Sequence, residues 1–388
     1  MTAFPRNESD VIAPWLVEML ARMRARGVEV EVLTSSYKGM GNHVTRGIPV
    51  HRFRYFPAPW ENLTHEETAP DRMRKSLLYR VMPAFYVAAG MVAAWRLARK
   101  RRYDIVHVHW PMPHALFGWS AQRAAGSRVV ATFYSVEVRW ISRGVPALKA
   151  FLRWTIRFPD RAVAISSTTA AEIRTVANVP VDVIPYTIAL PPAAPAKAPP
   201  GETRLLFVGR LVERKGVDVL LRALASLKDL SMLRLAVVGD GPEMDTLVAL
   251  AGELGVATRV EFVGRASDER LREEYARASM FVLPAIVDAR GDTEGLGVVL
   301  LEAMNSRVPV IASDAGGIVD IVEPDKTGLL VPPGDASALA GAIRQLATDH
   351  EKARALGEAG YRRLVERFSW DSIVDRWLAI YEQVLERR

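Results

Sequence analysis

The chain has 388 residues, which is long for one domain, and its 49% hydrophobic content is enough for two cores. It contains no cysteine, so disulfides and thiolate metal sites are excluded. The net charge is +12 for residues 1–188 and −5 for residues 189–388, which gives +7 for the chain. A basic first half suits nucleic acid, an anionic lipid surface or an anionic acceptor. Because neither an aromatic RNA-binding motif nor a helix-turn-helix stands out, we expect no nucleic-acid partner.

The first predicted helix runs from about Asp10 to Arg26 and precedes a strand from Val28 to Leu33. A right-handed crossover between parallel strands needs another strand before this helix. Only Met1 to Ala3 are available for it, so we expect the natural chain to begin upstream of Met1, by roughly one strand of 5–6 residues. The N-terminus lacks the apolar core of a signal peptide, which favours a cytoplasmic location.

An uncharged apolar run extends from Val81 to Trp95 and contains Pro83. Its 15 residues are too few to span a bilayer. Basic residues lie on both sides: Arg72, Arg74, Lys75 and Arg80 before the run, and Arg96, Arg99, Lys100, Arg101 and Arg102 after it. A helix with basic ends and an apolar body is suited to an anionic membrane surface, and the alternative is an ordinary core helix with solvated ends.

Short apolar strands alternate with helical patterns in both halves, which predicts two parallel-sheet domains. The remaining predicted strands are Asp104–His109, Arg128–Phe133, Ala162–Ile165, Val181–Ile184, Leu205–Val208, Leu233–Val238, Val260–Val263, Met280–Leu283 and Val308–Ile311. The prolines of segment 191–201 favour a semi-stiff tether. We therefore predict a first domain at 1–188, a linker at 189–203, a second domain at 204–369 and a final helix at 370–388.

Two histidines alternate in the strand that ends at His109. Alternation places His107 and His109 on one face, with His109 at the carboxyl end. A metal pair is not favoured because no carboxylate is near, and the chain has no Asp-x-Asp to hold a metal against a diphosphate. We predict a core or hydrogen-bonded His107 and a His109 that faces the cleft.

In the second half, the strand Leu205–Val208 ends at Gly209 and is followed by Arg210 and Lys215 before a helix. Ligands of open α/β sheets gather at the carboxyl ends of the strands. Two cations at this position suit an anionic ligand such as a diphosphate, although solvated surface cations are the alternative.

Two glutamates stand eight positions apart, at Glu294 and Glu302. Gly295 and Gly297 disfavour a helix interior, whereas Val298 to Met304 has the pattern of a buried helix. Glu294 is therefore predicted in the loop before that helix and Glu302 about two turns inside it. The free N–H groups of a helix start suit phosphate, and a carboxylate beside them can hold sugar hydroxyls. A plain loop glutamate and a partly buried one are the alternative.

Together with Val238 to Pro242, these segments resemble the motifs of glycosyltransferase family 4, over nearly the whole chain and most strongly after Thr203. The resemblance implies the α/β GT-B fold: two Rossmann-like, doubly wound domains facing a cleft, with the last helix crossing back to the first domain. It implies that Arg210 and Lys215 bind the donor diphosphate, that Glu294 contacts the donor sugar and that Glu302 contacts the ribose. The same motifs imply donor-binding roles for Gly209, Gly264, Gly295, Leu296 and Gly297.

Two segments depart from that family. Many relatives have Thr-Phe-His-Gly where this chain has Thr132-Phe133-Tyr134-Ser135, so Tyr134 replaces a histidine. A phenol donates a hydrogen bond but is a poor base near neutral pH. The segment 184–187 reads Ile-Pro-Tyr-Thr where relatives have Ile-Pro-Asn-Gly. We predict that His109, Tyr134 and Glu137 lie on the acceptor side of the cleft. We interpret the two departures as the mark of a subfamily with its own acceptor, and reduced activity is the alternative.

The resemblance implies a retaining glycosyltransferase that moves a sugar from a nucleoside diphosphate sugar to a hydroxyl acceptor. A lipid-linked or glycan precursor is the expected acceptor, and no metal or other cofactor is expected. Two alternatives stay open: a nucleotide-sugar epimerase of the GT-B fold, and a donor-binding protein with reduced transfer.

Overall fold

The computed structural model describes residues 4–7, 10, 12–63, 72–73, 76–135, 137–139, 148–188, 201–289 and 291–386. The chain forms two compact units. The first comprises residues 1–165, 169–186 and 373–388, and the second comprises 166–168 and 187–372. Most of the predicted linker, residues 189–200, lies outside the described residues. The last helix, α15 (Trp370–Glu386), groups with the first unit from Ile373 onward.

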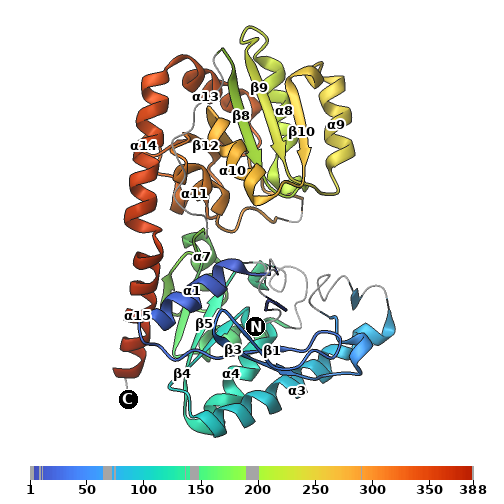
Figure 1. Ribbon diagram of the computed structural model, residues 1–388, viewed down its shortest axis with the longest axis vertical. Coiled ribbons are helices and arrows are strands. Elements are labelled where there is room, and N and C mark those ends of the chain that lie inside the picture. Colours follow the sequence, from blue (N-terminus) through green and yellow to red (C-terminus); the bar gives the residue numbers. More distant parts are fainter. Residues whose placement is uncertain are drawn as a thin grey trace. The chain divides into compact units, whose positions relative to one another are not determined.

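The first unit contains α/β structure in two separate sheets, with parallel pairing except between β2 and β3 (Figure 1). One sheet has the order β1-β3-β2 and the other β4-β5-β6-β7. The strands are β1 (Val32–Ser35), β2 (His43–Thr45), β3 (Ile48–Phe53), β4 (Ile105–His109), β5 (Arg128–Phe133), β6 (Arg161–Ala164) and β7 (Val181–Val183). The helices are α1 (Pro14–Ala25), η1 (Ala58–Trp60), α3 (Leu77–Arg101), α4 (Pro111–Ala125), α6 (Lys149–Arg157) and α7 (Ser167–Val176).

The start of this unit differs from the prediction of one doubly wound sheet. The strand begins at Val32 instead of Val28, because the Val28 amide still donates to Met23 O at the end of α1 (3.1 Å). In the described part of the chain no strand pairs with both β1 and β4, so the sheet is divided there. Buried Arg52 donates to the carbonyls of Ser35, Phe4 and Pro5 at 2.8–3.0 Å and so satisfies backbone groups beside β1. The further strand expected upstream of Met1 stays a prediction.

The second unit is the doubly wound sheet that the sequence predicts, with six parallel strands in the order β10-β9-β8-β11-β12-β13 and helices on both faces (Figure 1). Its strands are β8 (Thr203–Val208), β9 (Leu233–Val238), β10 (Val260–Gly264), β11 (Met280–Leu283), β12 (Val310–Ser313) and β13 (Leu329–Val331). Its helices are η3 (Glu213–Lys215), α8 (Val217–Ser226), α9 (Met244–Glu253), η4 (Ala257–Arg259), α10 (Asp268–Arg277), α11 (Val298–Asn305), α12 (Ile318–Ile321), α13 (Ala336–Thr348) and α14 (His350–Arg367). The strand order reverses between β8 and β11, where such sheets bind ligands.

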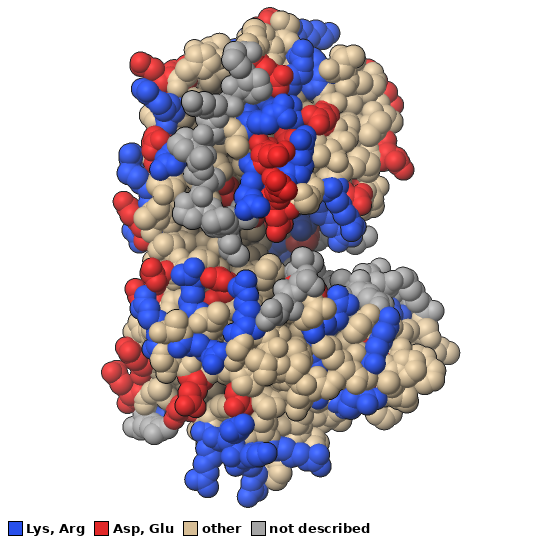
Figure 2. All heavy atoms as spheres, in the orientation of Figure 1, with Lys and Arg blue, Asp and Glu red and all other residues tan. Residues whose placement is uncertain are grey.

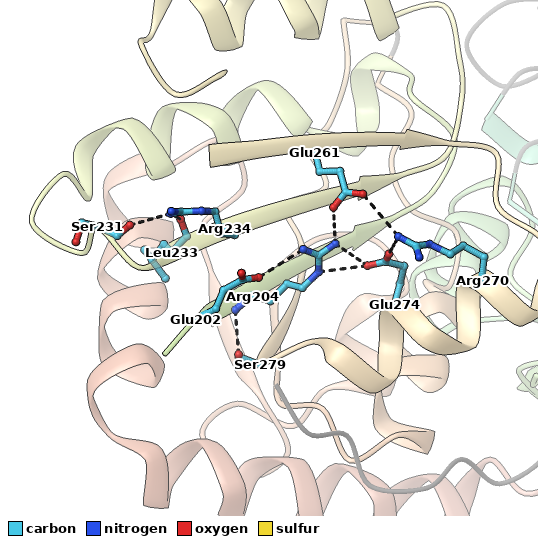
Figure 3. A network of polar contacts seen from close by, with 9 residues as sticks. All are labelled: Glu202, Arg204, Ser231, Leu233, Arg234, Glu261, Arg270, Glu274 and Ser279. Atoms are coloured by element: carbon cyan, nitrogen blue, oxygen red, sulfur yellow. Dashed lines mark hydrogen bonds and ion pairs between the residues drawn. The ribbon is translucent and has the colours of Figure 1, made fainter. Parts of the chain in front are cut away.

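At the opposite end of β8, a buried arginine holds two other elements (Figure 3). Arg204 Nη2 lies 2.7 Å from Glu261 Oε2 in β10 and 3.0 Å from Glu274 Oε2 in α10. Glu274 is fully buried, and Arg270 contacts its other oxygen at 2.6 Å. The network connects helix α10 to strands β8 and β10. The buried charges of Arg204 and Glu274 compensate each other, so the loss of one would leave the other without its partner.

We predict that Arg204→Met destabilises the second unit by about 3–5 kcal/mol, because it leaves the buried Glu274 carboxylate undercompensated. Urea unfolding measures this difference. Arg344→Met is the matched control, since it removes an exposed ion pair with Asp229. The control is expected to unfold like the wild type, and an equally small effect of Arg204→Met contradicts the prediction.

Candidate active site

The loops at the carboxyl edge of the second unit's sheet bring Lys215 and Glu294 together. Lys215 is buried at the end of η3, and its Nζ donates to Glu294 Oε2. Arg214 Nη1 lies 3.6 Å from the same oxygen, and Arg214 Nε lies 3.6 Å from Asp292 Oδ2. Burial alone would raise the pKa of Glu294, but Lys215 and Arg214 outweigh it and hold the pKa below its usual value. Glu294 is therefore an ionised, largely buried carboxylate between two cations.

The three cations of this loop differ in exposure. Arg210 follows Gly209 directly, is exposed, and makes no ion pair with any residue that the structure describes. The structure therefore places Lys215 on Glu294 and leaves Arg210 open to a ligand. Arg214 was not among the predicted site residues, although its position next to Lys215 was a signal.

Two glycines after β12, Gly316 and Gly317, pack against the backbone of the loop that carries Glu294, and we call this contact the glycine clamp. Gly317 N donates to Glu294 O at 3.0 Å. A Cβ at Gly316 would lie 1.9 Å from Glu294 O, and one at Gly317 would lie 2.2 Å from Gly295 O. The loop continues through buried Leu296 to Gly297, which precedes α11 with a φ of 87° that favours glycine. Among the residues described, no side chain caps α11, so the N–H groups at its very start, before Leu300, can bind an anion.

Glu302 lies in the second turn of α11, one turn earlier than predicted, where Tyr275 of α10 positions it. The Tyr275 hydroxyl donates to Glu302 Oε2 at 2.7 Å and lies 3.3 Å from Val299 O. Burial raises the pKa of Glu302, against the effect of this hydrogen bond. No local sequence pattern predicts the role of Tyr275, because the contact joins residues of two helices that are 27 positions apart.

The other predicted donor-site glycines lie at the carboxyl ends of strands: Gly209 directly follows β8, and Gly264 is the last residue of β10. Gly209 N donates to Val238 O at 3.0 Å, and Gly239 N donates to Gly264 O at 2.8 Å. These bonds continue the pairing of β8, β9 and β10 beyond the strands. Gly209 and Gly264 therefore line the same sheet edge as Lys215.

In the first unit, the predicted face of β4 is confirmed: the rings of His107 and His109 stack at 4.1 Å. His107 lies within 2.7 Å of both Tyr381 Oη and Thr132 Oγ1, and burial lowers its pKa to about 3. His109 Nδ1 lies 2.7 Å from Tyr134 Oη. Burial, then His107, holds the pKa of His109 well below its usual value. Both imidazoles are therefore neutral.

Tyr134 belongs to a group of aromatic rings at this edge of the first unit. Its ring stacks on Trp110 at 4.2 Å and lies 5.7 Å from Trp15, which in turn lies 4.7 Å from Tyr186. Burial, then Tyr186 and Glu137, raises the pKa of Tyr134 well above its usual value, so its phenol stays protonated. Ser135, which stands where relatives have glycine, has a left-handed φ of 79°. Trp15 and Trp110 were not among the predicted residues of this edge.

Glu137 is buried behind Tyr134. Its Oε1 accepts from the Tyr134 amide at 2.8 Å, and its Oε2 has no hydrogen-bond partner among the residues described. Burial raises the pKa of Glu137 to about 7, and Glu172 adds to this shift. Glu137 therefore changes charge near neutral pH, a property that its sequence position does not reveal. Within the described ranges, no cluster of three or more His, Asp or Glu side chains is arranged to hold a metal.

Comparison with known proteins places this geometry in a family. Residues 12–187 match the family described as glycosyl transferase 4-like domain, and residues 193–363 match glycosyl transferases group 1. The GDP-mannose-dependent alpha-(1-6)-phosphatidylinositol monomannoside mannosyltransferase of Mycobacterium tuberculosis is 30% identical over 359 residues, covering 86% of this chain and 91% of that one. The chain belongs to glycosyltransferase family 4. This confirms the resemblance seen in the sequence and makes the protein a nucleotide-sugar-dependent glycosyltransferase.

Other relatives agree in extent and fold. The N-acetyl-alpha-D-glucosaminyl L-malate synthase of Bacillus anthracis is 26% identical over 99% of this chain and 96% of its own. Sucrose-phosphate synthase from Thermosynechococcus elongatus superposes with a TM-score of 0.73 at 24% identity, covering 96% of this chain and 93% of that one. An Anabaena protein in complex with UDP, HepE, superposes with a TM-score of 0.72 at 18% identity, covering 97% and 98%. The predicted GT-B fold is confirmed.

We predict that Gly316→Ala destabilises the second unit by about 1–3 kcal/mol, because its Cβ would overlap Glu294 O and the backbone there is left-handed. It is also expected to weaken donor binding, since the Glu294 loop must shift. Urea unfolding and donor titration measure the two effects. Gly341→Ala in α13 is the control, because open space surrounds that position. A Gly316→Ala protein that matches the control in both measurements contradicts the clamp.

We predict that Glu137 makes the first unit less stable as pH rises. Its folded pKa is raised, so the stabilisation is fully present below the unfolded value of 4.5 and is lost as pH rises through about 7. The loss is at most about 3 kcal/mol. Unfolding measured between pH 5 and pH 8.5 is expected to show a flatter profile in Glu137→Gln than in the wild type. Parallel profiles would show that Glu137 does not titrate in this range.

Proposed function

We propose that the protein transfers a hexose, with retention of anomeric configuration and without a metal, from a nucleoside diphosphate sugar to a hydroxyl of a lipid-linked or glycan acceptor. The observation that carries the proposal is the Lys215–Glu294 pair at the carboxyl edge of the second unit's sheet. A cation and a sugar-binding carboxylate are held there side by side, beside the open start of α11.

The donor side has the charges that a leaving diphosphate requires. Lys215, Arg214 and the exposed Arg210 supply positive charge, and the first N–H groups of α11 add a partial positive charge. Preorganised groups of this kind stabilise charge that develops in the transition state. They can do so without a metal ion, which supports the metal-independent proposal.

The two glutamates suit different parts of the donor. Glu294 is ionised and fixed, so its oxygens can accept hydrogen bonds from sugar hydroxyls. Glu302 is held by Tyr275 and presents a carboxyl group in α11 for the ribose hydroxyls. These are the roles that the family resemblance implies.

The acceptor side contains neutral groups. His109 and Tyr134 form a hydrogen-bonded pair in which the imidazole is uncharged and the phenol protonated. The pair is suited to orienting a hydroxyl and is poorly suited to removing its proton. A front-face reaction, in which the acceptor attacks from the side of the leaving diphosphate, needs neither a protein nucleophile nor a strong base at this position.

The names of the relatives support a choice of donor and acceptor. The mycobacterial relative is named for GDP-mannose and for a phosphatidylinositol monomannoside acceptor. GDP-mannose and a lipid-linked acceptor are therefore the first pair to test. We also propose a cytoplasmic location with an anionic membrane surface as a partner, because the first half of the chain carries a net charge of +12.

The proposal is tested with a set of nucleotide sugars. A donor at a hundred times its dissociation constant stabilises the protein by about 2.7 kcal/mol, which thermal shift detects. The selected donor is then incubated with lipid-linked and glycan acceptors, and the anomeric configuration of the product is determined. A free or altered sugar formed equally without acceptor favours an epimerase, and donor binding without any turnover favours a binding protein.

We predict that Glu302→Ala weakens donor binding by roughly 1.5–3 kcal/mol, the contribution of a charged hydrogen bond. Lys215→Ala and Arg210→Ala are expected to lower turnover more than they lower donor affinity. Titration calorimetry and initial rates separate the two effects. Glu253→Ala, an exposed change in α9, is the control. Wild-type affinity and turnover in all three site variants would refute the site assignment.

A further inference from the structure

Helix α3 is a structural part of the first unit on one face only. Its buried residues are spaced by four positions: Met82, Tyr86, Gly90, Ala94 and Ala98. This face packs on α4, where Phe117 occupies the space that a Cβ at Gly90 would need, and Ser120 Oγ donates to Met91 O at 2.7 Å. Tyr86 also pairs with His114 at 3.0 Å. These contacts fix α3 along the core.

The opposite face of α3 is apolar and exposed. We call it the α3 stripe; its large side chains have 40–75% of their surface exposed and are Leu77, Val81, Phe85, Val92 and Trp95. The smaller Ala84 and Ala88 fill the exposed positions between them. At 1.5 Å per residue, the stripe is roughly 27 Å long. A continuous apolar surface of this extent is rare on a soluble monomer and indicates an interaction surface.

Positive charge accompanies the α3 stripe. Residues 77–101 contain no Asp or Glu. Arg80 is exposed beside Val81, and the C-terminal end of the helix exposes Arg96, Arg99, Lys100, Arg101 and Arg102. Figure 2 shows Lys and Arg side chains gathered over this end of the first unit. The Arg99 guanidinium lies 4.9 Å from the centre of the Trp95 ring, so a cation and an amphipathic aromatic side chain meet at one end of the stripe.

We propose that the α3 stripe docks on an anionic lipid bilayer. An apolar helix face with an aromatic residue and a basic rim matches a bilayer surface, where apolar side chains enter the acyl boundary and Lys or Arg pair with anionic head groups. Because residues 77–101 contain no acidic side chain, no negative charge on this helix would repel the anionic head groups. The inference rests on the proposed function in one respect: a lipid-linked acceptor would be found at that surface.

The helix lies on the bilayer and does not cross it. Helix α3 has 25 residues, and it is the one helix in the described ranges that is long and apolar enough to span a membrane. The uncharged apolar run from Val81 to Trp95 lies inside this helix, which also contains Leu77 to Arg80 and the basic C-terminal end. Crossing would remove Met82 and Tyr86 from the core and break the contacts with α4. Docking uses only the exposed face and leaves those contacts in place.

The experiment measures co-sedimentation of the full chain with two kinds of vesicle, pure phosphatidylcholine and phosphatidylcholine with 30% phosphatidylglycerol. We expect binding to the anionic vesicles, little binding to the neutral ones, and loss of binding in high salt. Equal recovery with both kinds of vesicle, or no binding to either, overturns the proposal.

Two pairs of variants separate the apolar and electrostatic parts. Val81→Ser with Val92→Ser is expected to weaken binding roughly tenfold or more through lost apolar contact. Arg96→Gln with Lys100→Gln is expected to weaken it about fivefold per residue. The matched controls change equally exposed residues of the second unit: Val248→Ser with Val365→Ser, and Arg354→Gln with Arg362→Gln. Controls that lose as much binding as the α3 variants overturn the assignment to the stripe.

Two further measurements complete the test. Light scattering of the wild type and of the valine variant asks whether the stripe is instead covered by a second copy of the chain. A wild-type dimer that the variant dissociates, without a change in vesicle binding, overturns the proposal. Donor binding by thermal shift is recorded for every variant. Vesicle binding without donor binding defeats the proposed function alone, and donor binding without vesicle binding defeats the docking inference alone.

Discussion

The candidate active site depends on one constraint, the burial of the Glu294 carboxylate between Lys215 and Arg214. A largely buried carboxylate is costly unless cations compensate for its lost hydration, and here two cations on one loop do so. The ion pair joins the loop after β8 to the loop before α11, which are far apart in the chain. The glycine pair after β12 completes the arrangement, because only residues without a Cβ fit against Glu294 O and Gly295 O. Charge compensation thus holds the Glu294 side chain, and close packing of the two glycines holds the backbone of the same residue.

The two units use different physical chemistry at their sheet edges. In the second unit the groups are charged, and the ion pair keeps the pKa of Glu294 low. In the first unit His109, Tyr134 and Glu137 are buried without a described cation in contact. Burial therefore lowers the pKa of His109 and raises those of Tyr134 and Glu137, which favours the neutral form of each group. A donor diphosphate needs the first environment, and an uncharged acceptor hydroxyl is suited to the second. The replacement of the family histidine by Tyr134 fits this division, since a buried phenol can donate a hydrogen bond without carrying charge.

Helix α3 packs on the core with one face and exposes an apolar face on the other side. Its small residues Gly90, Ala94 and Ala98 lie on the buried face, as do Met82 and Tyr86. The large apolar side chains of the α3 stripe lie on the exposed face. Ordinary amphipathic helices place polar residues on the outer face. In α3 the outer face carries apolar side chains instead. For this reason its hydropathy pattern alone does not distinguish a core helix from a helix that lies on a membrane or one that spans it.

The sequence by itself determined the fold class and the family, and it singled out most of the candidate donor-site residues. Short, buried apolar strands have a local signal, so β5, β9 and β11 were predicted to the residue, as was the start of α11 after Gly297. Only the tertiary structure decided which partners meet. Arg214 on Glu294, Tyr275 on Glu302 and the clamp at Gly316 all join segments distant in sequence, and no local pattern encodes such contacts. The strands β2, β3 and β13 and the divided sheet of the first unit were also not predicted, because their formation depends on pairing with neighbouring strands. The pKa shift of Glu137 and the exposed face of α3 also follow from burial, which is a property of the folded chain and not of its residue order.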